Sequence, residues 1–516
     1  MVAPMKSRAQ GDRGAAGEGS ASDRPTGAAR RTRAPRGSWL TAAAVARAAG
    51  GEIVQRGEAA ATIVTDTRGD CSGRLFVALR GSNHDGHDHL AAALRAGAVG
   101  LLVDRPLSEL PALQVALRQL ATGDRAPYVV RVADTGKALL DLAGEHRRRH
   151  RAKVVGITGS CGKTSTKEWL GAVLARSMPT VRSPGSYNNQ IGVPLTLFAI
   201  TPDTRAAVVE IGTNAPGEIA QLTGVARPDI GIVTCVAPAH LEGLGSVAGV
   251  AREKAALPQG LPEDGLCILN GDDAACRAMA EGTRATVQFT SVSRAVDWFA
   301  TDVRFHALGT TFRLRGERPV TLPRLGTHNV YNALAVIAAA THLGVAEEDV
   351  LQALASVPSA ARRLEPKCRA GVTIFDDTYN MNPQSARVAL QAMAGLSGPG
   401  RRIAVFGEML ELGAAGEALH RELGAEIVRT RQDLLVCLGD GARPIADGAI
   451  AAGMTANRVL LVPDIDAAFA ALTGELREGD RVLCKASRRV ALDRLVDRLL
   501  VALGPDADPA AAEQAR

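Results

Sequence analysis

Short apolar runs alternate with amphipathic stretches along most of the chain, and this alternation predicts strands and helices in turn. The pattern is clearest in the middle third, where the expected elements are strands at 153–157, 206–211, 230–234 and 266–269 and helices at 164–176, from Glu218, at 247–257 and at about 328–343. Apolar strands that alternate with helices are typical of a mostly parallel sheet covered on both faces. Such sheets bind their ligands at the carboxyl ends of the strands.

Smaller units of the same kind are expected on both sides of the middle third. Before it, the pattern predicts helices at 40–50 and 91–96 and strands at 61–65, 75–79 and 99–103. After it, a doubly wound α/β unit is predicted, with strands at 372–376, 402–406, 434–438 and 481–484. The expected division is a disordered basic leader at 1–36, domains at 37–131, 132–362 and 363–504, a hinge at 358–361 and a disordered tail at 505–516.

Composition narrows the class of protein. The net charge is +6, but residues 1–36 carry eight Lys/Arg and three Asp/Glu, so the rest is close to neutral and no nucleic-acid partner is expected. The leader has no apolar segment, which excludes a secretory signal and leaves a disordered extension or an organelle transit peptide. No apolar run approaches the ~20 residues that span a membrane. Eight scattered cysteines without a C-x-x-C pair indicate reduced thiols and a cytoplasmic protein.

The segment VVGITGSCGKT, from Val154 to Thr164, carries the strongest chemical signal. An apolar strand leads into a glycine turn, and the turn into a helix that opens with Lys163 and Thr164. Such a turn lets backbone N–H groups surround phosphates, while the lysine neutralises the β/γ oxygens and the hydroxyl reaches Mg²⁺. The strict G-x-x-x-x-G-K-[ST] pattern is broken, because Ile157 stands at its first glycine position. We predict a nucleotide triphosphate site here, against the alternative of a chance GKT tripeptide.

Further polar residues stand where the predicted strands end. Glu210 is a natural Mg²⁺ ligand beside a phosphate loop, or else a surface glutamate. His240 lies in the glycine-rich loop AHLEGLGS beyond the next strand, and Lys254 lies on the helix after it. Taken alone, such a histidine is more often structural and such a lysine more often a solvated charge.

Two later segments carry the same kind of signal. His328 and Asn332 are four residues apart and share a helix face, so they either bind a base or ribose or cap the helix. Asp376 and Asp377 end a predicted strand in the segment DDTYNMNP. Turn chemistry explains the asparagines and the proline of this segment, but not two adjacent acids at the end of a buried strand.

The ordered motifs TGSCGKT, YNNQIGVPLT, EIGTN-x-x-GEI, AHLEGLGS, HNVYNALA, DDTYNMNP and CKASR closely resemble those of the Mur ligases over about residues 60–490. The resemblance implies a small N-terminal α/β domain, a central ATPase domain of the phosphate-loop type with a parallel sheet, and a C-terminal Rossmann-like domain. It also implies an ATP-dependent carbon–nitrogen ligase of peptidoglycan precursor synthesis. ATP would phosphorylate the terminal carboxylate of a UDP-linked peptide, and an incoming amine would attack the acyl phosphate.

The resemblance assigns roles to residues by their match to these motifs. The residues expected to act in catalysis are Lys163, Glu210, His240, Lys254 and Asp377. Those expected to bind ATP are Thr158, Gly159, Ser160, Cys161, Gly162, Lys163, Thr164, His328, Asn329, Asn332, Arg363 and Asp377. The expected substrate residues are Asp66, Thr67, Arg68, Asp85, Asp88, Asn188, Asn189, Asn380, Lys485 and Arg488. Two Mg²⁺ ions are expected on Thr164, Glu210, His240 and Lys254, the last carbamylated by CO₂.

Within the family, AHLEGLGS and NAPGEI favour the branch that joins D-alanyl-D-alanine to UDP-N-acetylmuramoyl-tripeptide, and a monomer is expected. The alternatives are another amino-acid ligase of the superfamily, adding diaminopimelate or lysine or resembling folylpolyglutamate synthase, and a non-catalytic nucleotide-binding partner protein. Two positions depart from the family pattern. Cys235 stands where relatives commonly carry asparagine, and Ala256 stands where many carry glutamate.

Overall fold

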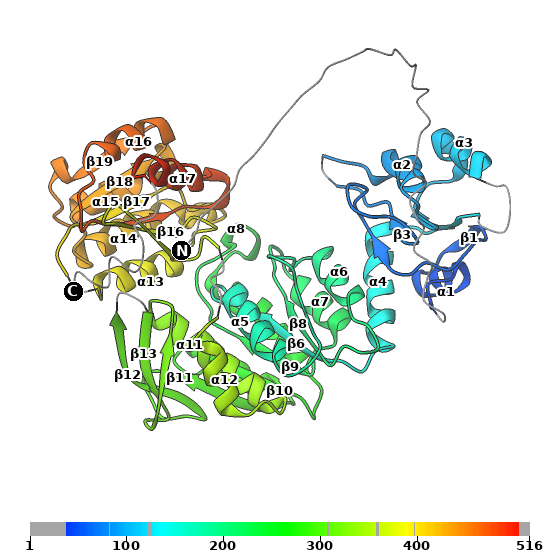
Figure 1. The fold of residues 1–516 in the computed structure, drawn as a ribbon, viewed down its shortest axis with the longest axis horizontal. Helices are drawn as coiled ribbons and strands as arrows, with labels where there is room; N and C mark the ends of the chain where they lie inside the picture. Colours follow the sequence, from blue (N-terminus) through cyan, green and yellow to red (C-terminus); the bar gives the residue numbers. More distant parts are fainter. Residues whose placement is uncertain are drawn as a thin grey trace, which may run out of the picture.

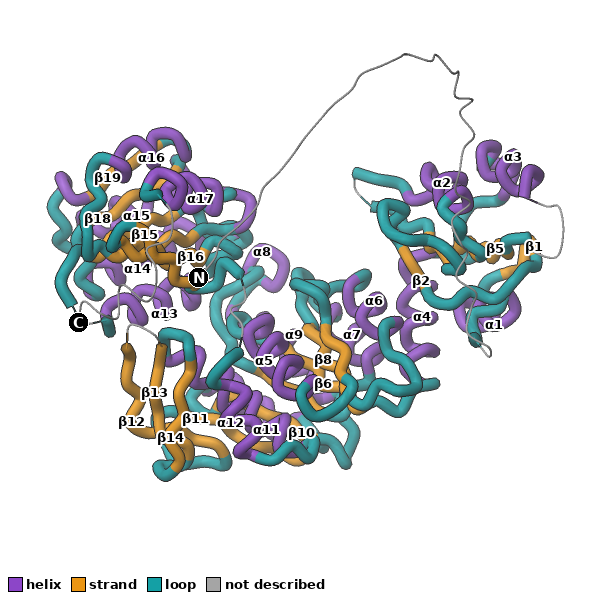
Figure 2. Tube along the Cα trace, viewed as in Figure 1, coloured by secondary structure: helices purple, strands orange, loops and turns teal. Residues whose placement is uncertain are grey.

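The fold is that of a computed structural model, which describes residues 38–504 apart from 82, 121–125, 307–308, 358–360 and 397. The predicted leader and tail, and most of the predicted hinge at 358–361, lie outside the described residues. Three sheets follow one another along the chain and form three units, which we call N-terminal, middle and C-terminal (Figure 1). The α/β class expected from the sequence is confirmed, because each sheet is mainly parallel and has helices packed on it (Figure 2).

The N-terminal unit is built on a five-stranded sheet in the order β1-β5-β4-β3-β2, in which only the edge strand β1 is antiparallel to its neighbour. Its strands are β1 (Glu52–Gln55), β2 (Ile63–Val64), β3 (Leu75–Val77), β4 (Gly100–Val103) and β5 (Tyr128–Arg131). Its helices are α1 (Ala42–Ala49), α2 (Leu90–Arg95) and α3 (Pro111–Leu120). The five predicted elements are confirmed, whereas β1, α3 and β5 were not expected.

Helix α4 (Thr135–Arg148) connects the N-terminal and middle units. It begins at Asp134, whose side chain accepts a hydrogen bond from the backbone N–H of Lys137. Its buried residue Leu142 belongs to a single apolar core that also contains Val45 of α1 and Leu222 of the middle unit. The two units therefore share one core, through a helix that the sequence analysis did not assign.

The middle unit is a nine-stranded sheet in the order β14-β13-β12-β11-β10-β9-β6-β8-β7. Its strands are β6 (Lys153–Thr158), β7 (Thr180–Arg182), β8 (Ala206–Glu210), β9 (Ile230–Val233), β10 (Leu266–Asn270), β11 (Thr286–Ser291), β12 (Trp298–His306), β13 (Gly309–Leu314) and β14 (Arg318–Leu322). Its helices are α5 (Lys163–Ala175), α6 (Gly192–Phe198), α7 (Glu218–Ala226), α8 (Leu241–Leu244), α9 (Val247–Gln259), α10 (Ala274–Ala278), α11 (Thr327–His342) and α12 (Glu347–Leu354).

Both faces of this sheet are covered, as the continuous apolar runs predicted. On β6, Val155 and Ile157 pack with α5 and α11, while Val154 packs with α4, α6 and α7. The expectation of a parallel sheet is correct for β7 to β12 and incomplete beyond, because β13 and β14 continue it as antiparallel strands. This extension was missed because β13 and β14 lack a continuous apolar run, since both carry arginine and threonine among their apolar residues.

The C-terminal unit is a six-stranded sheet in the order β15-β16-β20-β17-β18-β19, with an antiparallel edge strand β15. Its strands are β15 (Glu365–Arg369), β16 (Val372–Asp377), β17 (Arg402–Phe406), β18 (Leu434–Leu438), β19 (Val459–Val462) and β20 (Arg481–Lys485). Its helices are α13 (Pro383–Ala394), α14 (Gly416–Arg429), α15 (Arg443–Ala451), α16 (Ile465–Thr473) and α17 (Asp493–Ala502). Strands β16 and β20 are neighbours, and their register sets Asp377 opposite Lys485.

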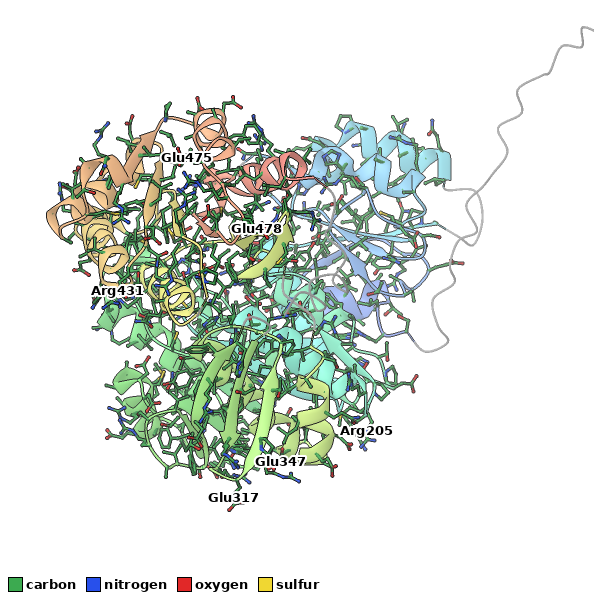
Figure 3. All side chains as sticks on the ribbon, turned by 60° about the vertical axis from the view of Figure 1, so that its left-hand side comes forward. Arg205, Glu317, Glu347, Arg431, Glu475 and Glu478 are labelled. Carbon is green, nitrogen blue, oxygen red and sulfur yellow. The ribbon has the colours of Figure 1, made fainter. Side chains whose placement is uncertain are left out.

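Charged side chains of both signs are distributed around the outside of the molecule. Arg205, Glu317 and Arg431 are exposed and project from the periphery (Figure 3). Among the described residues, no helix combines the length and the apolar character that a membrane crossing requires.

Candidate active site

The predicted phosphate loop has the expected local structure. β6 ends at Thr158, the chain turns through Gly159 (φ 145°) and Gly162 (φ 85°), and α5 starts at Lys163. No side chain caps this helix at Gly162, so the backbone N–H groups of its first turn point to the space beyond the sheet. The loop is anchored from behind, because Ser160 N donates to Cys235 O at 2.9 Å. The turn is therefore held open for an anion at a helix N-terminus.

Gly162 also touches Asn332 of α11. A Cβ at this position would lie 2.5 Å from Asn332 Oδ1, which already accepts a hydrogen bond from Thr166 Oγ1 at 3.2 Å. Asn332 in turn donates to Asn329 Oδ1 at 3.2 Å. These buried amides support the phosphate loop from α11, so the helix expected to contact nucleotide also fixes the loop.

We expect Gly162→Ala to lower the affinity for ATP by more than about tenfold, since both its positive φ and its contact with Asn332 force the loop to move. The matched control is Gly217→Ala, which has the same left-handed φ (89°) with nothing within 4 Å of the added methyl group. Isothermal titration of each variant with a non-hydrolysable ATP analogue measures the difference. Equal affinities in the two variants would contradict the proposed role of the contact.

Glu210 ends β8 beside the loop and is 1% exposed. It accepts hydrogen bonds from Thr164 Oγ1 (2.9 Å) and Asn188 Nδ2 (2.9 Å), and it has no ion-pair partner in the part of the chain described. A buried carboxylate without a cationic side chain, beside a hydroxyl and a phosphate loop, suits a hard cation such as Mg²⁺. The described residues hold no group of three His, Cys, Asp or Glu side chains placed for a metal, so phosphate oxygens or water would complete the coordination.

Lys163 and Lys254 lie near each other but have different surroundings. Lys163 Nζ donates to Gly159 O at 2.6 Å and lines the cavity described below. Lys254 is 1% exposed, and its amine makes no hydrogen bond or ion pair with the described residues. Burial, and after it the charge of Lys163, lowers the pKa of Lys254 to about 7. The structure thus rejects the alternative that Lys254 is an ordinary solvated charge.

His240 adopts a left-handed backbone conformation (φ 53°) at the start of α8. Its Nδ1 lies 2.7 Å from Glu411 Oε2 of the C-terminal unit, and the histidine holds the pKa of Glu411 below its usual range. The sequence analysis missed Glu411. Its signal was its place in the loop that follows β17, since the carboxyl ends of parallel strands meet at one edge.

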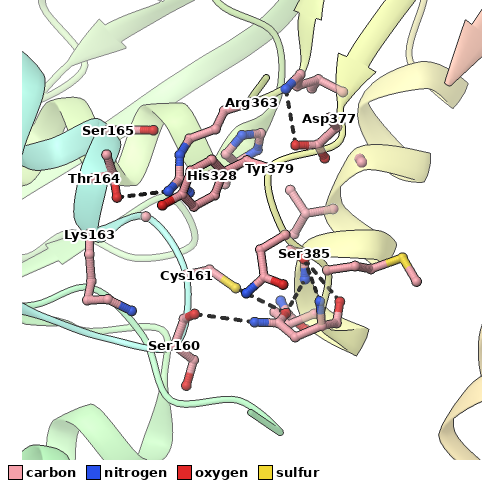
Figure 4. A pocket seen from close by; sticks show the side chains of 18 of the residues that line it. Ser160, Cys161, Lys163, Thr164, Ser165, His328, Arg363, Asp377, Tyr379 and Ser385 are labelled. Carbon is pink, nitrogen blue, oxygen red and sulfur yellow. Dashed lines mark hydrogen bonds between the residues drawn. The ribbon is translucent and has the colours of Figure 1, made fainter. Parts of the chain in front are cut away.

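The C-terminal unit contributes a second group of charges. Lys485 Nζ donates to Asp377 Oδ2 at 2.6 Å and to Asn380 O at 3.0 Å, and burial raises the pKa of Asp377 although Lys485 opposes this. Arg363 stacks 4.3 Å over the Tyr379 ring and donates to Thr164 Oγ1 at 2.9 Å (Figure 4). Arg363 therefore joins the C-terminal unit to the phosphate loop.

His328 stands beside this group at the start of α11. It is neutral in this setting, because burial lowers its pKa to about 4, and its Nδ1 has no hydrogen-bond partner in the described structure. A buried ring nitrogen without a partner is available to a ligand.

These residues surround one cavity of about 720 Å³ between the middle and C-terminal units. The predicted site residues that line it are Ser160, Cys161, Gly162, Lys163, Thr164, Asn188, Glu210, His240, His328, Asn329, Asn332, Arg363, Asp377, Asn380, Lys485 and Arg488. Thr158, Gly159, Asn189 and Lys254 do not line it. Asn189 instead caps the start of α6, where its Oδ1 accepts from Gly192 N at 2.9 Å.

The predicted residues of the N-terminal unit are not part of this cavity. Asp66 and Arg68 form an exposed ion pair at 2.6 Å. Asp85 is fixed by His87 (2.7 Å) and by Arg105, while Asp88 is exposed. They lie in the segments that follow β2 and β3.

Known families and proteins are similar to this chain over most of its length. The Mur ligase middle-domain model matches residues 157–340, and the Mur ligase glutamate-ligase-domain model matches residues 362–488. The UDP-N-acetylmuramoyl-tripeptide–D-alanyl-D-alanine ligases of Bacillus subtilis (strain 168) and Escherichia coli (strain K12) are 34% and 35% identical to this chain. In both cases the match covers 85% of this chain and 93% of the relative.

Two solved structures are also similar to this chain in fold. MurF from Acinetobacter baumannii is 29% identical with a TM-score of 0.80, and the match covers 90% of this chain and 99% of that one. MurF ligase from Thermotoga maritima, solved in complex with ADP, is 26% identical with a TM-score of 0.74, over 86% of this chain and 97% of that one.

Proposed function

Since the chain belongs to the Mur ligase family, we propose that it joins D-alanyl-D-alanine to UDP-N-acetylmuramoyl-tripeptide at the expense of ATP, in peptidoglycan precursor synthesis. One observation carries this assignment to the cavity. The phosphate loop and Glu210 face Arg363 and the Asp377–Lys485 pair across it, so a nucleotide and an anionic peptide can be held together between two units. We expect the protein to work as a monomer in the cytoplasm.

In the proposed reaction, an oxygen of the peptide carboxylate attacks the γ-phosphorus of ATP and ADP leaves. The amine of D-alanyl-D-alanine then attacks the acyl carbon, loses a proton and expels phosphate. Both steps bring anions together, so catalysis consists mainly of positioning and charge neutralisation. Lys163 and the N–H groups of the loop would hold the phosphates. Thr164 and Glu210 would hold Mg²⁺, which supplies further positive charge at the phosphate oxygens.

The C-terminal side of the cavity is suited to the other parts of the substrates. We assign adenine and ribose to the region of His328, Asn329, Asn332, Arg363 and Asp377. Lys485 and Arg488, with Asn188 and Asn380, are assigned to the peptide carboxylate and the incoming dipeptide. Asp66, Thr67, Arg68, Asp85 and Asp88 would contact the UDP end on the N-terminal unit.

Lys254 is proposed to be carbamylated. An amine with a pKa of about 7 is uncharged in a substantial fraction of molecules near pH 7. The uncharged amine is a nucleophile, and its nitrogen attacks the carbon of CO₂ and loses a proton to give a carbamate anion. The product replaces an unpaired buried cation by a carboxylate-like ligand. Together with His240 it would hold a second Mg²⁺.

The function is tested by phosphate release and product mass with purified protein. We expect turnover with UDP-N-acetylmuramoyl-tripeptide and D-alanyl-D-alanine, and assays with the diaminopimelate and lysine forms of the tripeptide identify the third residue. Turnover with a single amino acid on the corresponding dipeptide, and none with D-alanyl-D-alanine, would favour another ligase of the superfamily instead. No turnover with any acceptor would favour a nucleotide-binding partner protein.

We also expect the molecule to become more compact when ATP analogue and UDP-tripeptide bind together, since the ATP site is formed from two units. Small-angle scattering measures this as a fall in the radius of gyration, with ATP analogue alone as the control. An unchanged scattering curve at saturating ligand would contradict domain closure.

A further inference from the structure

Two cysteines meet at the phosphate loop. Cys161 lies within the loop, and Cys235 lies two residues beyond the end of β9. The two segments run side by side, because Ser160 N donates to Cys235 O at 2.9 Å and Thr234 N donates to Thr158 O at 3.0 Å. Cys235 Sγ lies 3.7 Å from Cys161 O, and both residues line the cavity. The backbone hydrogen bonds therefore hold the two residues side by side.

Cys161 differs from the five buried cysteines of the described residues. Cys71, Cys267, Cys276, Cys437 and Cys484 are buried, and burial raises the pKa of each. Cys161 shows the opposite shift. The Cys235 thiol, and after it the Asn382 side chain and the Lys163 ammonium, lower its pKa. The pKa of Cys235 is raised, first by its interaction with Cys161. A thiolate next to a thiol is the arrangement needed for oxidation followed by disulfide formation.

We propose that Cys161 and Cys235 form an intrachain disulfide on exposure to peroxide. The Cys161 thiolate attacks one oxygen of hydrogen peroxide, the O–O bond breaks, and a sulfenic acid and water result once protons are taken up. The Cys235 sulfur then attacks the sulfenic sulfur, the S–O bond breaks and a second water leaves. Two thiols lose two electrons, and one peroxide is reduced to two waters. The cavity gives the oxidant access to both residues.

The disulfide changes the part of the loop that receives phosphates. Cys161 Sγ lies 3.3 Å from Asn382 Oδ1 of the C-terminal unit, and a bond to Cys235 removes it from that contact (Figure 4). The disulfide also ties the loop, at a position two residues before Lys163, to the segment after β9. We therefore expect oxidised protein to bind ATP at least about tenfold more weakly, because displacements near 1 Å are costly at such sites. Bound ATP should slow the oxidation.

The test uses the full chain treated with hydrogen peroxide. Mass spectrometry of peptides prepared without reductant should reveal a 161–235 cross-link with the loss of two hydrogens, and dithiothreitol should remove it. ATP affinity should fall in parallel and recover on reduction. The ligation rate should also fall on oxidation and recover on reduction. That readout rests on the proposed function, whereas the cross-link and the ATP affinity do not.

Single variants separate the two steps, each compared with its own untreated sample. Peroxide should form no cross-link in Cys161→Ser and should not lower its ATP affinity. In Cys235→Ser, peroxide should oxidise Cys161 to sulfinic and sulfonic acids, which dithiothreitol does not reduce. Cys368→Ser, which removes an exposed thiol elsewhere, should behave as the parent protein. The proposal is overturned if peroxide lowers ATP affinity without a 161–235 cross-link, or if the Cys161→Ser and Cys235→Ser double variant responds as the parent does.

Discussion

Replacement of Lys163 by alanine should lower kcat/KM of the ligation by at least about a hundredfold, since it removes a positive charge from the phosphates in a partly desolvated cavity. The lysine already lies at the loop, with its amine 2.6 Å from Gly159 O. The fold should be kept, because the side chain lines the cavity and is not part of an apolar core.

Phosphate release at varied ATP measures the loss, and thermal unfolding checks that the variant is folded. Lys137→Ala is the control, because Lys137 is exposed on α4, where it pairs with Asp141 at 2.6 Å and does not line the cavity. Turnover in Lys163→Ala equal to that of Lys137→Ala would remove the phosphate loop from the mechanism.

Replacement of Lys254 by methionine should abolish ligation and make the protein more stable. The amine is buried and makes no hydrogen bond or ion pair with the described residues, so an apolar side chain of similar length removes a desolvation cost on the order of 4 kcal/mol near neutral pH. Loss of turnover together with a higher free energy of unfolding is the signature of a residue retained for chemistry.

The pH dependence of this gain has a definite sign. The pKa of Lys254 falls from 10.5 to about 7 on folding, so between these values the unfolded chain binds a proton that the folded chain does not. The contribution of Lys254 to stability therefore rises with pH across this window and is least favourable below it. Urea unfolding in CO₂-free buffer should show a larger gain for Lys254→Met at pH 6.5 than at pH 9.

Lys167 provides the contrast. It is equally buried, but its amine donates to Ser183 O (2.8 Å) and Gly185 O (2.7 Å) and pairs with Glu168. Lys167→Met should be destabilising, because those acceptors lose their donor.

Turnover that survives in Lys254→Ala would refute the carbamate at Lys254, and recovery of Lys254→Ala turnover by a short-chain carboxylic acid would support it.

Local pattern was sufficient for the central parallel strands β6, β8, β9 and β10 and for the phosphate loop. β6 and β8 are continuous apolar runs because both faces of the sheet are covered, and the turn at Gly159 and Gly162 follows from positive φ values that glycine adopts without strain. Pattern could not decide between alternatives for Lys254, because a lysine on an amphipathic helix is solvated or buried according to which elements pack over it.

Contacts between units were beyond the reach of the sequence. Glu411 pairs with His240, and Tyr379 Oη donates to Ser186 Oγ at 2.6 Å, across separations of more than a hundred residues. The pattern of apolar and polar residues around these side chains does not indicate which residues of another unit they contact. The Cys161–Cys235 contact lies within the middle unit and was missed for another reason, because the sequence does not show that β6 and β9 are neighbours in the sheet.

The shared core at α4 limits how this protein can exchange parts with its relatives. A recombination point after Arg131 would place Val45 of α1 and Leu142 of α4 in chains of different origin, although they pack in one core. The same crossover would keep α4 with α6 and α7 but would pack it against an N-terminal sheet from another protein. We therefore expect the N-terminal unit to be inherited together with the sheet of the middle unit, and new specificities to arise by substitution within this pair rather than by shuffling of whole domains.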